Sequence, residues 1–350
     1  MQAAPHKTSI QHDPLISVII CTCGRATALQ NLLEALELQT CQKFEILIVD
    51  GNQELSPARE AVESYLKRSN LSEKLVLIKS QKGLTRQRNV GLQAVRGDIV
   101  CFFDDDVTFQ QNFLAEVVAL FAQPDMQDVG GITPYDTLHY PFALSLRWRM
   151  RAALGVMPSL NPGEVDRLGR AVPISFLKPF TGNKQVGWLP GFGMIYRRAA
   201  VEGLRFDEWL PTYGGEDRDY SMRVGERSRL LICGDLHLQH HYSTEGRNDG
   251  LLRLRECSFG AGRRFAKYGR GFRDHLSVAQ TFFGDFLVDL FAFARSPRTV
   301  NFLTIFVRLH ASFEGLRSVK EPEQTAVVSP AVDSSTQQEV PVLVRNERDR

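Results

Sequence analysis

The sequence predicts an α/β protein with a mostly parallel central sheet, followed by a helical extension. Short β-branched runs alternate with segments of helical periodicity over residues 16–107, which is typical of parallel strands joined by crossover helices. Two of these runs end directly in acidic residues, which would lie together at one edge of such a sheet. Beyond residue 250 the apolar residues recur at helical spacing.

The expected elements follow one another in chain order. Residues 1–14 are polar and are expected to form a flexible arm. Leucines at helical spacing mark one face of the first helix, and a proline near its start favours the second. The expected strands and the helices between them are residues 16–21, 26–39, 44–49, 57–68, 74–79, 83–95 and 97–103.

The fourth strand ends in three consecutive carboxylates, Asp104, Asp105 and Asp106. A strand interior cannot hold this much negative charge, so we expect a loop at the carboxyl end of the strand, where open α/β sheets bind ligands. The three carboxylates repel one another unless a cation joins them, which predicts a divalent metal ion. The alternative is a solvated acidic loop, or a set of N-caps for the short helix expected at residues 109–121.

Positive charge lies between the two acidic strand ends. Lys82, Arg86 and Arg88 put positive charge near a glycine turn and the first turns of a helix, whose N-terminus favours anions. A diphosphate held by metal and basic residues fits this placement, and the alternative is a solvated basic helix face.

Composition excludes several classes of protein. The 42 Lys and Arg residues nearly balance the 40 Asp and Glu residues, and the net charge of +2 predicts no nucleic-acid partner. Residues 21–25 lack the glycine spacing of a dinucleotide-binding turn, and no Walker A loop occurs, which argues against oxidoreductases and P-loop NTPases. The six cysteines are expected to be reduced thiols. No signal-peptide pattern and no uncharged apolar run of roughly 18 to 20 residues occurs, so a cytoplasmic location is expected.

Four blocks, at residues 17–25, 48–52, 83–91 and 97–106, resemble glycosyltransferase family 2 in sequence and in order. The resemblance covers roughly residues 15–245. It implies the GT-A fold, a nucleotide-diphosphate sugar as donor, and Mg²⁺ or Mn²⁺ as cofactor. It would place the glycosyltransferase domain at 15–250, with an irregular acceptor-side insertion at 134–184. Beyond the match, helical spacing predicts an extension at 251–318, and a composition rich in Pro, Gln, Ser and charged residues predicts a disordered tail at 319–350.

The resemblance implies a donor pocket at the strand ends. Asp50 resembles the acid that hydrogen-bonds the nucleotide base, and the backbone around Cys21 and Thr22 would border the same pocket. Arg25 is counted among the donor-binding residues, and Arg88 would face the diphosphate or ribose.

The acidic triplet resembles the D-x-D motif of the family. Asp106 would be the main metal ligand, and Asp104 would face the ribose or a metal-bound water, or bind the metal as well. Asp105 borders the donor site and would point back into the protein or to solvent. A hard cation held by oxygen ligands would neutralise the leaving diphosphate.

Residues 185–198 and 206–223 resemble later parts of the family. The resemblance makes Asp217 the general base of an inverting reaction, with Glu216 as the second candidate. Asp219 would orient the helix or an arginine. The alternative for all three acids is helix capping, since carboxylates suit a helix N-terminus. Further on, His240 would reach the metal or diphosphate, with His241 second.

The remaining segments suggest partners. Residues 134–184 are rich in Arg, Pro and aromatic side chains and would bind the acceptor or form a lid, or else make no ligand contact. Helices are expected at 257–273, 277–294 and 300–310, and their basic and aromatic residues suit a seat on a membrane surface. The alternatives are packing on the catalytic domain or a homodimer.

The sequence therefore predicts a metal-dependent, inverting glycosyltransferase. It would act on a saccharide or lipid-linked acceptor in surface polysaccharide or glycolipid assembly, in the cytoplasm or at the inner face of the membrane. Two alternatives are a non-catalytic sugar-nucleotide-binding scaffold and a nucleotidyltransferase. The second normally has a glycine-rich loop after its first strand, and this chain has one glycine there.

Overall fold

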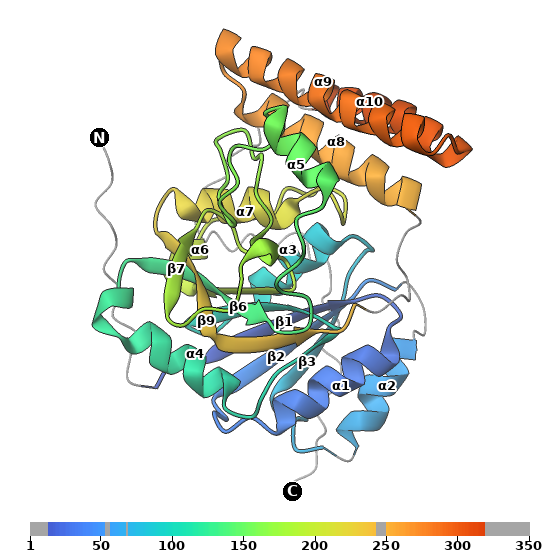
Figure 1. Ribbon diagram of the computed structural model, residues 1–350. Coiled ribbons are helices and arrows are strands. Elements are labelled where there is room, and N and C mark those ends of the chain that lie inside the picture. The colour runs from blue at the N-terminus through green and yellow to red at the C-terminus, as the bar shows by residue number, and fades with distance from the viewer. Residues whose placement is uncertain (1–12, 53–56, 68, 243–249, 319–350) are drawn as a thin grey trace, which may run out of the picture.

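The computed structural model describes residues 13–52, 57–67, 69–242 and 250–318. The predicted arm and the predicted tail fall largely or wholly outside these ranges. The described residues form one mixed sheet with helices on both faces, and three long helices stand beyond the helices of one face (Figure 1). The α/β prediction is confirmed.

The central sheet is mostly parallel, as predicted for its first four strands. The strand order is β3-β2-β1-β4-β8-β6-β9-β5, and β7 pairs with β9 outside this path. β8 is antiparallel to β4 and to β6, whereas β6 and β9 are parallel, so that β9 has the same direction as β4. The strands are β1 (Ile16–Thr22), β2 (Phe44–Asp50), β3 (Leu75–Lys79), β4 (Ile99–Asp104), β5 (Val107–Thr108), β6 (Val129–Asp136), β7 (Asn183–Val186), β8 (Gly193–Arg197) and β9 (Arg229–His240).

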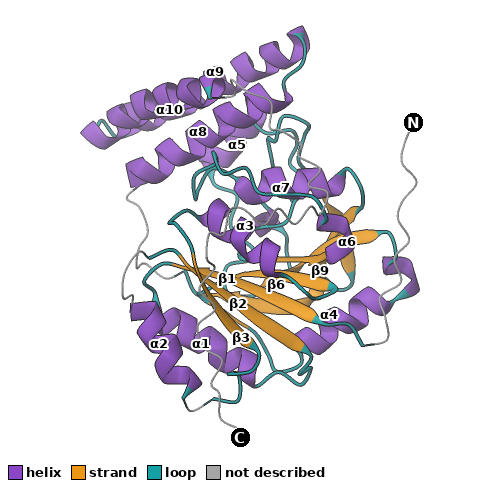
Figure 2. Ribbon diagram, turned by 180° about the vertical axis from the view of Figure 1, so that it is seen from behind, coloured by secondary structure: helices purple, strands orange, loops and turns teal. Residues whose placement is uncertain are grey.

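Helices cover both faces of the sheet, and the two opposite views agree on their placement (Figure 1, Figure 2). One face carries α1 (Ala26–Glu37), α2 (Pro57–Leu66) and α4 (Phe113–Ala122). The other carries α3 (Leu84–Ala94), α6 (Arg198–Val201) and α7 (Glu216–Gly225). Both faces of β1, β2 and β4 are therefore buried, which is why these strands are almost continuously apolar.

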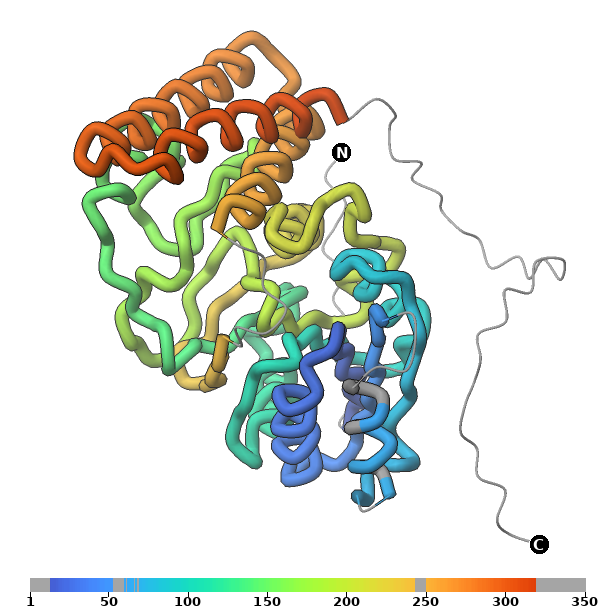
Figure 3. The backbone as a smooth tube through the Cα atoms, turned by 90° about the vertical axis from the view of Figure 1, so that its right-hand side faces the viewer, coloured from blue at the N-terminus to red at the C-terminus, as the bar shows by residue number. Residues whose placement is uncertain are grey.

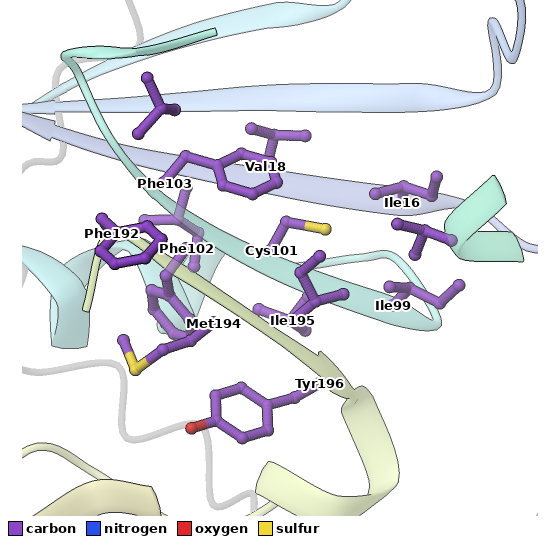
Figure 4. Packing of buried hydrophobic residues seen from close by; sticks show 14 of the residues in the cluster. Ile16, Val18, Ile99, Cys101, Phe102, Phe103, Phe192, Met194, Ile195 and Tyr196 are labelled. Atoms are coloured by element: carbon purple, nitrogen blue, oxygen red, sulfur yellow. The ribbon is translucent and has the colours of Figure 1, made fainter. Parts of the chain in front are cut away.

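The core lies on either side of β4 and its neighbours β1 and β8 (Figure 4). Phe102 is 1% exposed and makes edge-to-face contacts with Tyr196 and Phe206. On α3, Gly91 packs so closely on β1 that a β-carbon there would lie 2.6 Å from Ile19 Cγ2. This rigid strand layer fixes the positions of the strand ends.

The insertion between β6 and β7 rises from the sheet to the C-terminal helices, as Figure 3 shows. It contains α5 (Leu146–Ala153) and one short 3-10 turn, Ile174–Phe176, and α5 is tied to α9 by the ion pair of Arg151 with Asp285, 2.6 Å. Another 3-10 turn, Pro124–Met126, precedes β6 and lies outside the insertion.

The three C-terminal helices are α8 (Gly250–Tyr268), α9 (Phe272–Arg295) and α10 (Thr299–Arg317). The predicted helix over 257–273 is wrong at both ends, because α8 begins earlier and stops at Tyr268, before the two glycines Gly269 and Gly271. All six cysteines are free thiols, as predicted.

Among the described residues, α9 is long and apolar enough to cross a membrane by length and composition, and 28% of its most apolar 18-residue window is buried. The two acids in the middle of this helix face the protein. Asp285 and Asp289 are 8% and 2% exposed and pair with arginines of α5 and α10. The polar side of α9 therefore packs on neighbouring helices, and its apolar side remains exposed.

Asp219 joins α7 to α8. Its carboxylate pairs with Arg223 at 2.9 Å, lies 3.2 Å from Lys267 Nζ and accepts a hydrogen bond from the Tyr268 hydroxyl at 2.7 Å. Burial acts to raise the pKa of Asp219, but these partners outweigh it and hold the pKa below its usual value. The residue that was expected to orient a helix or an arginine does both here.

Replacing Asp219 with Asn is expected to destabilise the protein by about 3–5 kcal/mol at pH 7, because it removes the buried carboxylate that pairs with two partly buried cations, Arg223 and Lys267. A folded-state pKa below the unfolded value gives stability that is present above the unfolded pKa, about 4, and is lost as the pH falls through the folded pKa. The difference between wild type and variant should therefore shrink below about pH 4. Urea unfolding at several pH values measures it, with Glu226→Gln, at the exposed residue directly after α7, as control. An equal difference at all pH values would contradict this account.

Candidate active site

The carboxyl ends of the parallel strands carry most of the predicted site residues. β1 ends at Thr22, β2 at Asp50, β4 at Asp104 and β9 at His240. These strands share one direction, so their ends meet at one edge of the sheet. The ends of β1, β2 and β4 lie at this edge because these strands are parallel. His240 lies at the same edge because the pairing of β8, β6 and β9 gives β9 the direction of β4.

Asp104, Asp106 and His240 form one cluster. Their ligand atoms all lie within 4.8 Å of one another. His240 Nε2 is 3.1 Å from Asp106 Oδ1 and 4.0 Å from Asp104 Oδ2. Asp106 and His240 are buried, whereas Asp104 is partly exposed. Two carboxylates and an imidazole at this spacing are a suitable donor set for Mg²⁺ or Mn²⁺.

The other histidines of β9 and its end point elsewhere. His241 is exposed, and its Nε2 lies 2.7 Å from Thr108 Oγ1. His237 Nε2 lies 3.0 Å from the Gly234 carbonyl. Of the two candidates from the sequence, His240 is the one that the fold brings to the acidic pair.

The cluster fits a divalent cation on two counts. Both ring nitrogens of His240 are buried; among the described residues Nδ1 has no hydrogen-bond partner, and Nε2 approaches the two carboxylates of the cluster without an aligned hydrogen bond, which is unusual for an imidazole unless a ligand completes it. The surrounding site also holds more carboxyl groups than guanidiniums. The guanidiniums are those of Arg25 and Arg88, and the carboxyl groups are those of Asp104, Asp105, Asp106, Glu216 and Asp217. A cation would offset this excess of negative charge.

Asp105 lies inside the protein, beneath the cluster. It is 0% exposed, accepts a hydrogen bond from Thr22 Oγ1 at 2.8 Å, and pairs with Arg25 at 2.5 Å. Burial raises the pKa of Asp105 to about 7, against the opposing effects of Arg25 and Thr22. Arg25 also reaches Asp106, with Nη1 3.1 Å from Oδ2. Asp105 therefore holds Thr22 and Arg25 in place, and any effect on a donor would pass through these two side chains.

Arg88 connects the acidic strand end to α7. It is 2% exposed, and its Nη1 donates to Glu216 Oε1 at 3.1 Å. Its Nη2 donates to the Gly191 carbonyl at 3.0 Å and lies 3.5 Å from Asp104 Oδ1. Burial acts to lower the pKa of Arg88, but Glu216 and Asp104 raise it overall, so the guanidinium stays charged. Arg88 therefore stands behind Asp104, where it fixes the relative positions of the two acidic groups.

Glu216 and Asp217 are consecutive but lie in different environments. Glu216 is 5% exposed, and burial together with the charge of Asp217 raises the pKa of Glu216 to about 8, with Arg88 opposing. Asp217 is only partly buried, and its Oδ2 accepts a hydrogen bond from the Gly191 backbone N–H at 3.0 Å. Asp217 thus has an oriented carboxylate with an accessible part, whereas Glu216 is enclosed.

The loops after β1 and β2 border the site on its other side. Asp50 is 6% exposed, and its Oδ1 accepts hydrogen bonds from the backbone and side-chain nitrogens of Asn52 at 3.0 and 2.8 Å. Gln87 donates to the carbonyls of Thr22 and Val49 at 2.9 and 2.8 Å, which joins the two strand ends. Beside them, burial raises the pKa of the Cys21 thiol to about 12, so it stays neutral.

Sequence reasoning missed the residues that surround His240. Asp136 is 0% exposed, its Oδ2 lies 2.9 Å from His139 Nδ1, and its Oδ1 accepts a long hydrogen bond from the His240 backbone at 3.4 Å. The rings of Phe192 and Tyr242 lie 4.8 and 4.1 Å from that of His240, measured between centroids. The rule that acids at parallel strand ends share one edge could have found Asp136, which ends β6, but no local signal marks the others.

Comparison with known proteins finds glycosyltransferases, both among family models and among related sequences. The model of "Glycosyl transferase family 2" matches residues 17–205. Polypeptide N-acetylgalactosaminyltransferase 11 of Xenopus tropicalis is 27% identical over 219 residues, which are 60% of this chain and 35% of that protein. This chain spans about a third of the length of the curated relatives that head the comparison.

Two solved structures have a similar fold. The mannosyltransferase PcManGT from Pyrobaculum calidifontis, in complex with GDP-Man and Mn²⁺, gives a TM-score of 0.52 at 16% identity, over 88% of this chain and 76% of that one. TarS of S. aureus in complex with UDP-GlcNAc gives 0.53 at 18% identity, over 89% and 82%. The predicted GT-A fold, with its C-terminal helices, is confirmed.

Proposed function

This chain belongs to glycosyltransferase family 2, and from that membership we propose that it transfers a sugar from a nucleotide-diphosphate donor to an acceptor hydroxyl with inversion at the anomeric carbon. The observation that carries the proposal is the chain of contacts through Arg88. This residue approaches Asp104 of the cluster, bonds Glu216, and through Gly191 reaches Asp217. One buried guanidinium thus fixes the candidate metal-binding cluster and the candidate base relative to each other.

The donor would lie along the strand ends. Asp50 would accept from the nucleotide base, and the backbone at Cys21 and Thr22 would border that base or its ribose. Asp104, Asp106 and His240 would hold Mg²⁺ or Mn²⁺, which supplies positive charge to the leaving diphosphate. Arg25, which pairs with Asp105 and Asp106, lies close enough to the cluster to add to the positive potential there.

The acceptor would approach from the side of α7. Asp217 would accept the proton of the acceptor hydroxyl as its oxygen attacks the anomeric carbon, and the bond from that carbon to the diphosphate oxygen would break on the opposite face. The hydrogen bond from Gly191 holds the carboxylate in one orientation. Glu216 would act through Arg88, because it is enclosed and paired.

Thermal stability with UDP, GDP, dTDP and CDP tests the proposed donor site, each with Mn²⁺ and then with excess chelator. Ligand at a hundred times its Kd stabilises by about 2.7 kcal/mol, which raises the melting temperature measurably. A rise with one nucleotide that chelator abolishes is expected. If well-folded protein responds to none of the four, the chain is better explained as a scaffold that keeps the fold without the activity.

We further propose that α9 and α10 seat the protein on a membrane surface, near a saccharide or lipid-linked acceptor of surface polysaccharide or glycolipid assembly. The exposed side of the two helices carries large apolar residues that are 42–78% exposed: Phe272, Leu276, Phe283, Leu290, Phe291, Val300, Phe302, Leu303, Phe306, Leu309 and Phe313. Exposed arginines stand at both ends of α9, at positions 270, 273, 295 and 298. An apolar face bordered by basic residues suits an anionic lipid surface.

Replacing Phe283 or Phe306 with Asp is expected to weaken binding to vesicles of phosphatidylglycerol and phosphatidylcholine by about tenfold or more. The aromatic ring passes from water into the lipid on binding, and the substitution removes this favourable transfer. Vesicle flotation measures the effect. Leu160→Asp, at an equally exposed site in the insertion, is the control. A different outcome would contradict the proposal: the wild-type protein does not bind vesicles but forms a dimer, and the same substitutions dissociate that dimer. The apolar face would then be a homodimer interface.

A further inference from the structure

A cavity lies outside the candidate active site, between the insertion and the C-terminal helices. It measures about 310 Å³, near the lower end of the range of roughly 300–1,000 Å³ for small-molecule sites. Its walls come from α5, the start of α7, and α8 to α10, and include the rings of Trp148, Trp188, Phe265 and Phe282. Five arginines also line it: Arg151, Arg170, Arg218, Arg264 and Arg308.

Three of these arginines are neutralised by carboxylates. Arg151 pairs with Asp285, and Arg170 with Asp166, each at 2.6 Å. Arg308 pairs with an acid of α9, Asp289, at 2.5 Å. These pairs explain why this part of the interface between the insertion and the helices is so rich in arginine.

The other two, Arg218 and Arg264, form no ion pair with any residue in the described part of the chain. Their hydrogen bonds go to backbone carbonyls: Arg218 Nη1 donates to Gly169 at 3.0 Å, and Arg264 Nη1 donates to Gly214. The Nε atoms of both side chains are buried and have no partner among the described residues. Arg264 is only 4% exposed.

The two guanidiniums lie next to each other. A β-carbon built on Gly215 would be 2.6 Å from Arg264 Nη1 and 3.1 Å from Arg218 Nη2, so both groups flank the same glycine. Burial, and then the charge of Arg218, lower the pKa of Arg264 to about 9, although the more distant charges of Asp219 and Asp217 oppose this. Burying two like charges next to each other without a directly paired carboxylate is unfavourable, and an anion bound between them would reverse the sign of that interaction.

We propose that Arg218 and Arg264 form an oxyanion site in this cavity, which binds a phosphate group. The planar guanidinium presents donors in a fork that matches phosphate oxygens, and the unpartnered Nε groups remain to be satisfied. The aromatic walls would take the apolar or sugar-like body to which the phosphate is attached.

The site lies on the acceptor side. Arg218 directly follows Asp217, the candidate base, on α7. If the chain is the glycosyltransferase proposed above, on which this step rests, a phosphate ester held by Arg218 would place the acceptor's hydroxyls close to that base. The anion site would then select acceptors that carry phosphate, whereas the strand ends would select the donor.

Isothermal titration calorimetry in the presence of chelator tests the site without any donor, metal or turnover. Inorganic phosphate and glycerol 1-phosphate are titrated at matched ionic strength. Saturable binding of both is expected, with Arg218→Gln weakening it at least about tenfold, since a charge-assisted hydrogen bond is lost. Arg264→Gln should have the same effect. Arg227→Gln, which removes an exposed arginine at the other end of α7, should leave binding unchanged.

The outcomes separate the two proposals. Phosphate binding that depends on Arg218 supports the anion site even if no nucleotide binds at the strand ends. Binding of inorganic phosphate without the ester would overturn the assignment to the acceptor, and no saturable binding, or equal loss in Arg227→Gln, would overturn the site itself. If Arg264→Gln does not fold, Arg218→Gln decides, because Arg218 is only partly buried.

Discussion

Asp217→Asn is expected to lower the rate of sugar transfer by roughly 10²–10⁴-fold, the usual contribution of a general base. The amide keeps the shape of the carboxylate and can still accept the hydrogen bond from Gly191, so the fold and donor affinity should change little. The loss should therefore appear in kcat, with the Kd of the nucleotide unchanged. Single-turnover transfer and calorimetric titration of the nucleotide that stabilises the protein measure the two quantities.

Glu216→Gln is the informative companion to this variant. Glu216 pairs with the buried Arg88, which also approaches Asp104, so its substitution should disturb nucleotide affinity as well as the rate. If Glu216→Gln instead removes transfer with unchanged affinity while Asp217→Asn remains active, the roles of the two acids must be exchanged. If both variants remain active, the base lies outside this pair.

Asp106→Asn is expected to weaken Mn²⁺ binding by about 100-fold or more, because even residues outside the coordination shell typically cost 10–100-fold in metal affinity. Asp106 lies within 3.1 Å of both His240 and Arg25, so its charge acts on both sides of the cluster. The rate of sugar transfer should fall together with the affinity for Mn²⁺. Electron paramagnetic resonance of free Mn²⁺ in the presence of the nucleoside diphosphate measures the affinity directly.

The control for this substitution is Asp128→Asn. Asp128 immediately precedes β6, at the opposite edge of the sheet, where it pairs with Arg229. The same change of charge there should leave Mn²⁺ affinity unaltered. Unchanged affinity in Asp106→Asn would remove this residue from the metal site, and His240→Asn would then show whether Asp104 and the histidine bind the ion without it.

Local pattern in the sequence was sufficient for the first four strands of the sheet and for one edge of the site. Strands and crossover helices differ in apolar period, and a charged residue cannot continue a buried strand, so the alternation and the positions of Asp50 and Asp104 could be read directly. Local pattern gives the wrong result at residues 257–273, because the helical spacing continues across two glycines that in fact lie between α8 and α9.

Contacts between distant segments could not be read in this way. The burial of Asp105 against Arg25, the link from Arg88 to Glu216, and the surroundings of His240 all join residues that are far apart in the chain. So does the pair of Arg218 and Arg264, on two different helices.

The fold class, the family and the chemical types of residue at the strand ends follow from the amino-acid sequence alone, because they depend on short-range periodicity and on motifs within a few residues. Which side chains meet follows from the three-dimensional packing, because it depends on the antiparallel insertion of β8 between β4 and β6 and on the docking of α8 to α10. Whether a buried charge finds a partner is a property of the three-dimensional packing, and for this reason the two unpaired arginines became visible only there.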